Sequence, residues 1–286
     1  GMILKNGGRL VKEFPHIPGI DFSGTVIESE NSKFKKDDEV ILTGFRVGEI
    51  FYGGYSQIAK VNGDFLVHKP KNLTSKQAMI LGTAGFTSLM SAFAIKAREE
   101  ILLGEKVKTV LVTGATGGVG SIAVMILNKM GYDVTAVSGK DSKADYLKSL
   151  GAKSVINRAE FDKDPKLIDK GLWDGVVDTV GGKILANAIV QTNPTGIIAV
   201  CGNASTNELN TNVIPFMLRG INMLGIDSAM QSFENRVKIW DRLNKDFPKK
   251  FFEPITKVIS LSDLPNIGKD ILEGKIKGRV IVDVNI

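Results

Sequence analysis

The chain has 286 residues, of which 43% are hydrophobic and 24% charged, and this composition is typical of a globular protein long enough for two domains and a sizeable core. Its net charge of +6 comes without a block of lysine and arginine interleaved with aromatic residues, so binding to nucleic acid stays an alternative that the sequence disfavours. The single cysteine excludes an internal disulfide, no apolar run approaches the roughly 20 residues of a membrane span, and no signal-peptide core opens the chain. These features predict a cytoplasmic protein without a membrane segment.

The first 70 residues favour a small, irregular β-domain. Glycine-rich turns separate short β-type runs there, at 22–27, 39–43, 55–61 and 65–67. Thr74 and Gln77 have the spacing of a capping box, which predicts that a helix begins at this point. A second helix is expected over 86–100.

From residue 107 onward, predicted strands and helices alternate. Strands are expected at 108–113, 133–137, 153–156, 174–178, 196–200 and 221–226, and helices at 119–130, 142–149, 182–191 and 231–246. This alternation is typical of an α/β fold, a doubly wound parallel sheet with helices on both faces. A strand at 256–260, a helix near 262–273 and a strand at 279–284 complete the chain.

A glycine-rich turn directly follows the first strand of the alternating region. Gly114, Gly117, Gly118 and Gly120 lie between that strand and an apolar helix which Gly131 would end. Glycines at such a turn allow the pyrophosphate of a dinucleotide to approach the backbone N–H groups at the helix N-terminus. The alternative is a purely structural turn, but the strand–turn–helix–strand context favours dinucleotide binding.

The end of the second strand predicts which dinucleotide binds. An NAD site carries an acidic residue at that point for the ribose 2′-hydroxyl, whereas this chain has Ser138, Gly139 and Lys140. A hydroxyl, a flexible glycine and a cation suit a 2′-phosphate, and Arg158 after the third strand would supply a second cation. These residues favour NADP over NAD. The alternative is that both cations are solvated surface charges.

Other chemistry finds little support in the residue types. One cysteine and two histidines cannot build a structural zinc site, so no metal is expected. Cys201 is expected to be a packed small residue, and Asp178 either contacts a ligand or caps the helix that follows it. The predicted strand at 221–226 would be an apolar edge strand without lysine or proline, which predicts a homodimer through strand pairing unless a loop covers the edge.

Several stretches along the whole chain resemble the medium-chain dehydrogenase/reductase superfamily. Within it, the resemblance is to the zinc-free quinone-oxidoreductase-like branch and its acrylyl-CoA reductase group. The residues that carry the resemblance include Phe14-Pro-His-Ile-Pro-Gly-Ile-Asp-Phe-Ser-Gly24, Ile80-Leu-Gly-Thr-Ala-Gly-Phe-Thr87, Val112-Thr-Gly-Ala-Thr-Gly-Gly-Val-Gly-Ser121 and Gly225-Ile-Asp-Ser228. In zinc-dependent relatives a Gly-His-Glu sequence lies where this chain has Gly19-Ile-Asp21.

The resemblance implies a Rossmann NADP-binding domain at 83–248 and a GroES-like β-rich domain built from both chain ends, 1–82 and 249–286. It further implies NADPH as hydride donor and, as acceptor, the conjugated C=C of a short enoyl-CoA (acrylyl-CoA to propionyl-CoA). Carried over residue by residue, the cofactor contacts are Thr116, Gly117, Gly118 and Val119 at the phosphate turn, Ser138, Gly139, Lys140 and Arg158 at the 2′-phosphate, Gly202, Asn203, Phe216, Asp227 and Ser228 along the nicotinamide half, and Arg279 as a late contact to a cofactor or CoA phosphate.

The resemblance leaves three points open. Family members begin earlier, with β-strands and an Asn-Tyr-Lys-Asp-like segment beside the nicotinamide, so we expect this chain to lack that N-terminal part. No catalytic acid or base can be named, since Thr83 and Thr87 are better explained by helix capping and packing. Quinone or enone reduction, and NADPH binding without catalysis, remain alternative functions.

Overall fold

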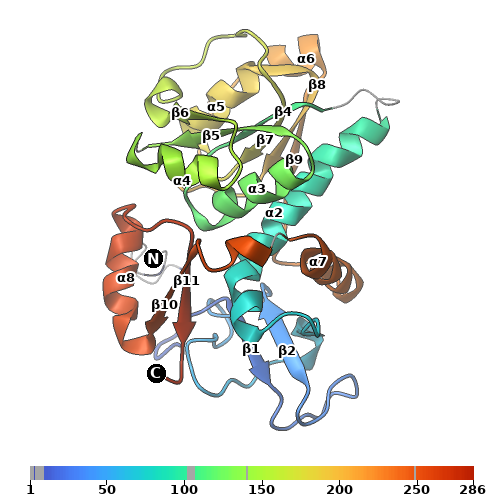
Figure 1. The fold of residues 1–286 in the computed structure, drawn as a ribbon, viewed down its shortest axis with the longest axis vertical. Coiled ribbons are helices and arrows are strands. Elements are labelled where there is room, and N and C mark those ends of the chain that lie inside the picture. Colours follow the sequence, from blue (N-terminus) through green and yellow to red (C-terminus); the bar gives the residue numbers. More distant parts are fainter. Residues whose placement is uncertain (1–2, 4–9, 102–106, 140, 248) are drawn as a thin grey trace. The chain divides into compact units, whose positions relative to one another are not determined.

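The computed structural model describes residues 3, 10–101, 107–139, 141–247 and 249–286, and these form two compact units (Figure 1). Thr87–Asp227 is called here the Rossmann unit, and Gly1–Phe86 with Ser228–Ile286 the β-rich unit. The units divide after residues 86 and 227, whereas the domain boundaries expected after 82 and 248 stay a prediction.

The Rossmann unit contains a six-stranded sheet that is parallel throughout. Its spatial order is β6-β5-β4-β7-β8-β9, which is the 3-2-1-4-5-6 order of doubly wound dinucleotide-binding folds. The strands are β4 (Thr109–Val112), β5 (Asp133–Ser138), β6 (Ser154–Asn157), β7 (Trp173–Asp178), β8 (Thr192–Val200) and β9 (Asn222–Gly225). The predicted parallel α/β sheet is therefore confirmed.

Helices pack against this sheet through apolar faces. All residues from Gly120 to Leu127 of α3 are buried, which is why that segment reads as uniformly apolar in the sequence. Ile184, Leu185 and Ile189 of α5 join the core formed with β4, β7 and β8. Besides the second part of α2 (Ser75–Ile101), the described helices of this unit are α3 (Gly118–Lys129), α4 (Ala144–Ser149), α5 (Gly182–Val190) and α6 (Ile214–Arg219), with the short 3-10 turns η2 (Asp141–Lys143) and η3 (Arg158–Glu160).

Helix α2 (Ser75–Ile101) begins with the predicted capping box. The Thr74 amide donates to Gln77 Oε1 and the Gln77 amide donates to Thr74 Oγ1, both at 3.1 Å. Gly82, at φ 49° and ψ −153°, breaks the helix into two segments. By length and composition Ser75–Glu99 could cross a membrane, contrary to the expectation from the sequence, but 72% of its apolar window is buried in the protein, as in a core helix.

The described part of the β-rich unit contains an antiparallel sheet, a parallel strand pair, the first segment of α2 and the helices α7 and α8. Alternating residues of the sheet, among them Val40 and Leu42, face a core with Phe34, Val47 and Leu66. The elements are β1 (Asp21–Thr25), β2 (Glu39–Thr43), β3 (Leu66–His68), α7 (Phe233–Asp246), β10 (Thr256–Ser260), α8 (Leu264–Leu272) and β11 (Arg279–Asp283), with η1 (Gly63–Phe65), η4 (Lys249–Phe251) and η5 (Leu261–Asp263).

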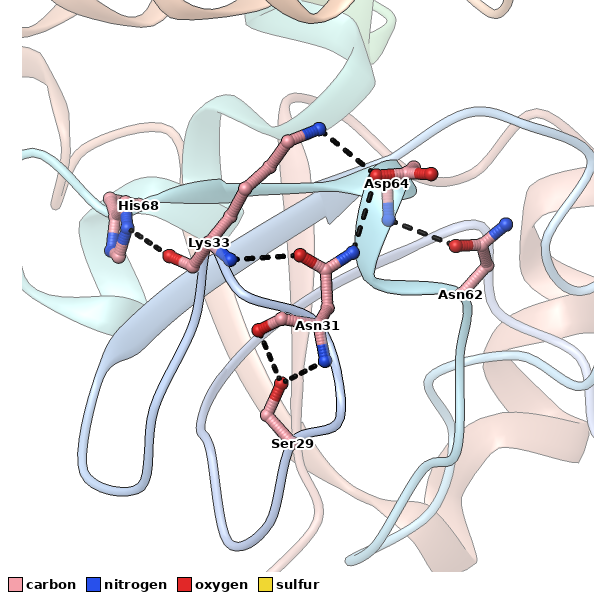
Figure 2. A network of polar contacts seen from close by, with 6 residues as sticks. All are labelled: Ser29, Asn31, Lys33, Asn62, Asp64 and His68. Carbon is pink, nitrogen blue, oxygen red and sulfur yellow. Dashed lines mark hydrogen bonds and ion pairs between the residues drawn. The ribbon is translucent and has the colours of Figure 1, made fainter.

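A polar network fastens the loop between β1 and β2 to the start of η1 (Figure 2). Asp64 Oδ1 accepts from Lys33 Nζ at 3.0 Å and from Asn31 Nδ2 at 3.2 Å, and these contacts lower the pKa of Asp64. The Asp64 amide donates to Asn62 Oδ1, and His68 Nε2 lies 3.2 Å from the Lys33 carbonyl. Except for the half-buried Asn31, these residues are exposed, so the network orders a surface loop and builds no site.

Two expectations about local structure differ from the fold. Residues 55–61, expected as a strand, form bends up to residue 58 and no regular structure after it. The amides at the start of this stretch pair elsewhere: Gly53, Gly54 and Tyr55 donate to carbonyls in the segment 17–19. Helix α6 was not expected, since six residues with exposed Met217 and Leu218 show no helical periodicity.

Asp174, at the amino end of β7, is expected to stabilise the Rossmann unit in a pH-dependent way. Burial opposes its ionisation, but hydrogen bonds from the Thr109 amide, Asn193, the Lys108 amide and the Thr109 hydroxyl outweigh burial and lower its pKa below the ordinary 3.8. A carboxyl group whose pKa is lower in the folded state than in the unfolded state stabilises the fold at pH values above the unfolded-state pKa. This contribution is lost as the pH falls through the folded-state pKa.

We therefore expect Asp174→Asn to reduce the free energy of unfolding by about 1–3 kcal/mol at neutral pH. As the pH falls from 3.8 through the lower folded-state pKa, the difference from the wild type should shrink, because the wild-type carboxylate becomes protonated as well. Urea unfolding across this pH range tests the expectation, with the exposed Asp241→Asn as control. A loss that is the same at every pH would contradict it.

Candidate active site: the dinucleotide crevice

The order of the sheet places a topological switch point at its carboxyl edge. Chain connections leave β4 toward β5 on one side and β7 toward β8 on the other, so the loops after these two neighbouring strands separate. Ligands of open α/β sheets bind at such a switch point. The glycine-rich turn follows β4 directly and therefore lies at this position.

The turn has the backbone geometry that its glycines predict. Gly114 has φ +57°, a conformation that L side chains rarely adopt, and Gly117 is the exposed N-cap residue of α3. A Cβ at Gly120 would lie 2.7 Å from Ala115 Cα, so this glycine allows the helix to begin close against the turn. Thr116, Gly118 and Val119 are half-buried beside Gly117, and the Val119 carbonyl accepts from Ser88 Oγ at 2.8 Å.

The predicted 2′-phosphate residues come together from two strands. Ser138, at the end of β5, pairs in register with Asn157 at the end of β6, and Arg158 follows Asn157. The exposed Arg158 guanidinium lies over Gly139: a Cβ built on Gly139 would be 3.2 Å from Arg158 Cζ and 3.4 Å from Nε. Lys140, the other predicted cation, lies outside the residues that the structure describes.

The loops after β7 and β8 are joined to each other. The Cys201 amide donates to the Asp178 carbonyl at 2.9 Å, and the Ser205 amide donates to the Val180 carbonyl at 2.9 Å. Gly202 is required here because a Cβ would lie 3.0 Å from the Thr179 carbonyl carbon. Asn203 is exposed in the same loop and its amide contacts Asn207. The structure therefore places Gly202 and Asn203 at the carboxyl edge, against the loop after β7.

The remaining predicted nicotinamide residues lie farther along the chain. Phe216, on α6, is partly buried and packs against the apolar core of the sheet. Asp227 is exposed after β9, at the last position of the Rossmann unit. Ser228 is the first residue of the following segment of the β-rich unit, where its carbonyl accepts from Arg236 Nη2 at 3.3 Å. Their contact with a nicotinamide stays a prediction.

Arg279 lies in a polar cluster inside the β-rich unit. Its Nε donates to the Ile80 carbonyl at 2.7 Å and its Nη2 to the Met79 carbonyl at 3.3 Å, so it caps the first segment of α2. Next to it, Asp21 accepts from the Thr83 amide at 2.7 Å and from Thr83 Oγ1 at 2.5 Å. Burial raises the pKa of Asp21, while Thr83 and Arg279 act in the opposite direction. These contacts favour a structural role for Arg279 and Thr83.

Sequence reasoning missed this cluster, because its members are separated by up to 258 positions and carry no shared spacing signal. It also missed Arg236 of α7, whose buried guanidinium lies 4.2 Å from the centre of the Phe45 ring and donates to Thr43 Oγ1 at 2.8 Å. A lone arginine on an amphipathic helix gives no warning of such burial.

The described residues bear on metal and thiol chemistry in three places. No group of three His, Cys, Asp or Glu side chains suited to a metal ion occurs within the described portion of the chain. Asp21, at the position of the glutamate in zinc-dependent relatives, is engaged by Thr83. Burial raises the pKa of the Cys201 thiol to about 12, so this cysteine is a poor nucleophile at neutral pH.

Comparison with known proteins agrees with this geometry. Residues 118–242 match the zinc-binding dehydrogenase family. The chain is 47% identical over its full length to the acrylyl-CoA reductase AcuI of Ruegeria pomeroyi, covering 86% of that protein. It is 45% identical to the putative quinone oxidoreductase YhfP of Bacillus subtilis over 99% of this chain and 85% of that protein.

Solved structures lead to the same group. The crystal structure of Escherichia coli YhdH with bound NADPH has a TM-score of 0.92 at 44% identity, covering 97% of this chain and 84% of that one. Bacillus subtilis YhfP, solved with NAD bound, has a TM-score of 0.90 at 44% identity, with the same coverages. By sequence identity, coverage and fold, the chain belongs to the medium-chain dehydrogenase/reductase family, in the branch that contains the acrylyl-CoA reductases and the quinone-oxidoreductase-like proteins.

Proposed function

We propose that this protein is an NADPH-dependent oxidoreductase that reduces the conjugated C=C of a short enoyl-CoA, converting acrylyl-CoA to propionyl-CoA. The observation that carries the cofactor assignment is the Arg158 guanidinium over Gly139, at the strand end where an NAD site would carry an acidic residue. The substrate follows from the 47% identical relative named acrylyl-CoA reductase.

The residues at the carboxyl edge fit such a cofactor. Gly117 and Gly118 leave the backbone at the start of α3 open to a pyrophosphate, and the helix N-terminus favours its negative charge. Arg158 and the Ser138 hydroxyl would hold the 2′-phosphate by charge-assisted hydrogen bonds. When bound, NADPH supplies the hydride for the β-carbon of the substrate. The protein binds and orients the reactants, and it needs no metal for this task.

Turnover of acrylyl-CoA tests the proposal. NADPH oxidation is followed by absorbance and propionyl-CoA is identified by mass spectrometry, with NADH as the alternative donor and a simple quinone as the alternative acceptor. We expect NADPH to be consumed one-for-one with propionyl-CoA formed. Binding of NADPH without turnover of either acceptor would favour a non-catalytic NADPH-binding protein, and no binding of NADPH would refute the assignment.

Quinone or enone reduction is the second candidate. The relative YhfP, 45% identical over nearly the whole chain, is named a putative quinone oxidoreductase, which is the observation that favours this alternative. A kcat/KM for a simple quinone that exceeds the value for acrylyl-CoA would select it.

We further propose that the protein forms a homodimer through β9. All four residues of this edge strand are exposed, including Met223 and Leu224, and α6 adds exposed Met217 and Leu218 from the same unit. We expect Leu224→Lys to convert a dimer to a monomer, because a buried lysine would disfavour pairing with a second β9. Light scattering after gel filtration measures this, with Leu272→Lys on α8 as a matched exposed control. A wild-type monomer would contradict the proposal.

A further inference from the structure

Asp178, the last residue of β7, is fully buried at the carboxyl edge of the sheet. Its Oδ1 accepts from Thr113 Oγ1 at 2.6 Å, and its Oδ2 accepts from the Gly181 amide at 2.9 Å and the Val180 amide at 3.3 Å. Thr113 directly precedes the glycine-rich turn, and Gly181 is the N-cap residue of α5. One carboxyl group therefore joins the loops of the two strands that flank the switch point.

The two loops are locked to each other by a closed set of hydrogen bonds. The Thr179 amide donates to Thr113 Oγ1, and Thr179 Oγ1 donates to the Thr113 carbonyl, both at 3.0 Å. Thr113 Oγ1 thus accepts from Thr179 while it donates to Asp178. Because each hydroxyl has a defined donor and acceptor role, the relative position of the two loops is fixed by specific groups rather than by apolar packing alone.

The backbone of Asp178 extends this link to a third loop. Its carbonyl accepts from the Cys201 amide at 2.9 Å and from Cys201 Sγ at 3.3 Å, and Cys201 directly precedes Gly202 and Asn203. Asp178 consequently contacts the first residues of the loops after β4, β7 and β8. In the β4 and β8 loops, Gly114 and Gly202 allow the chain to approach Thr179 more closely than a Cβ would permit.

We propose that Asp178 is a positioning residue of the dinucleotide site. Through Thr113 it holds the glycine-rich turn in place relative to the loops after β7 and β8, and this relative position determines the affinity for the whole cofactor. This proposal rests on the proposed NADPH-dependent function. Asp178 acts through Thr113 and the loop backbones and does not itself contact the reactants.

The ionised carboxylate suits this role. Three donors converge on its two oxygens, and every contact is one in which Asp178 accepts. Burial raises the pKa of Asp178, and the hydrogen bonds from Thr113 and the two amides oppose that effect. An asparagine would direct its NH2 group at one of these donors, so the contact with Thr113 or with the amides would be lost.

The test compares two ligands that occupy different lengths of the site. NADPH engages the phosphate turn, whereas 2′-AMP has only the adenosine and 2′-phosphate that would lie at Ser138 and Arg158. Affinities for both are measured by calorimetry or competition on the wild type and on Asp178→Asn, Thr113→Val and Thr113→Ser. The matched control is Asp174→Asn, which removes an equally hydrogen-bonded carboxylate at the other end of the same strand. Thermal unfolding is recorded for every variant.

We expect Asp178→Asn and Thr113→Val to weaken NADPH binding by about tenfold or more, with 2′-AMP within about twofold of wild type. Thr113→Ser keeps the hydroxyl and should restore most of the affinity lost in Thr113→Val. Asp174→Asn should lower the unfolding temperature and leave the NADPH affinity unchanged.

Equal losses for NADPH and 2′-AMP, equal losses in Asp174→Asn, or unchanged NADPH binding in Asp178→Asn would each overturn the positioning role. Wild-type binding and turnover would in each case leave the proposed function intact. A wild type that binds neither ligand would overturn both.

Discussion

Replacing Arg158 with alanine is expected to weaken NADPH binding by about one hundredfold and to leave NADH binding within about threefold of wild type. The guanidinium lies over Gly139 at the joined ends of β5 and β6, where a 2′-phosphate would accept two charge-assisted hydrogen bonds. NADH lacks that phosphate, so it should lose little. Fluorescence titration of both cofactors gives the two dissociation constants directly.

Lys153→Ala is the matched control for this change. Lys153 lies just before β6 at the amino edge of the sheet, where its Nζ is 2.6 Å from Asp133 Oδ2. Its removal deletes the same charge from the opposite edge. Similar losses of NADPH affinity in both variants would mean that only the net charge matters. If Arg158→Ala lost as much affinity for NADH as for NADPH, the argument for NADPH specificity would fail. The test also bears on YhfP, a relative whose solved structure holds NAD.

Gly120→Ala is expected to cost about 1–3 kcal/mol of folding free energy and to lower NADPH affinity by at least tenfold. The added Cβ would meet two backbone groups, with Ala115 Cα at 2.7 Å and the Gly114 carbonyl closer still. Since neither can rotate away, the start of α3 must move from the turn, and the amides proposed to bind the pyrophosphate move with it. Chemical denaturation and a cofactor titration measure the two effects.

Gly225→Ala provides the control, because a Cβ at this position of β9 would have no neighbour within 4 Å. We expect both its stability and its NADPH affinity to stay close to wild type. An alanine at position 120 that binds NADPH normally would show that the close approach of helix and turn is not needed for the cofactor.

The strands of the sheet could be predicted from the sequence because each strand is marked by residues that are close together in the chain. Buried parallel strands such as Thr109–Val112 and Trp173–Asp178 read as short β-branched runs, and the glycines after the first of them report a turn that few other residues could form. The same applies to the capping box at Thr74. Each of these features lies within a few consecutive residues, and over such short distances residue propensity and spacing predict the local backbone structure.

The parts that could not be predicted depend on partners that are distant in the chain. Residues 55–61 have the composition of a strand, but the neighbouring amides pair with the segment 17–19 instead. Asp178 could be named as a helix cap or ligand contact, but its bond to Thr113, 65 positions earlier, becomes visible only when β4 and β7 are neighbours. Arg158 and Gly139, by contrast, can be assigned to one site from the sequence, and only their close approach depends on the register of β5 and β6.

The direction of the sheet has a practical consequence for redesign. The loops that would hold ligands all leave one edge of the Rossmann unit, while Asp174 and Lys153 anchor the opposite edge. Substitutions that raise the unfolding temperature can therefore be placed at the amino edge. This edge lies about 15–20 Å from the loops that would hold ligands, the length of a strand of five or six residues. Ligand affinity and thermal stability can thus be changed by substitutions at different edges of the same sheet.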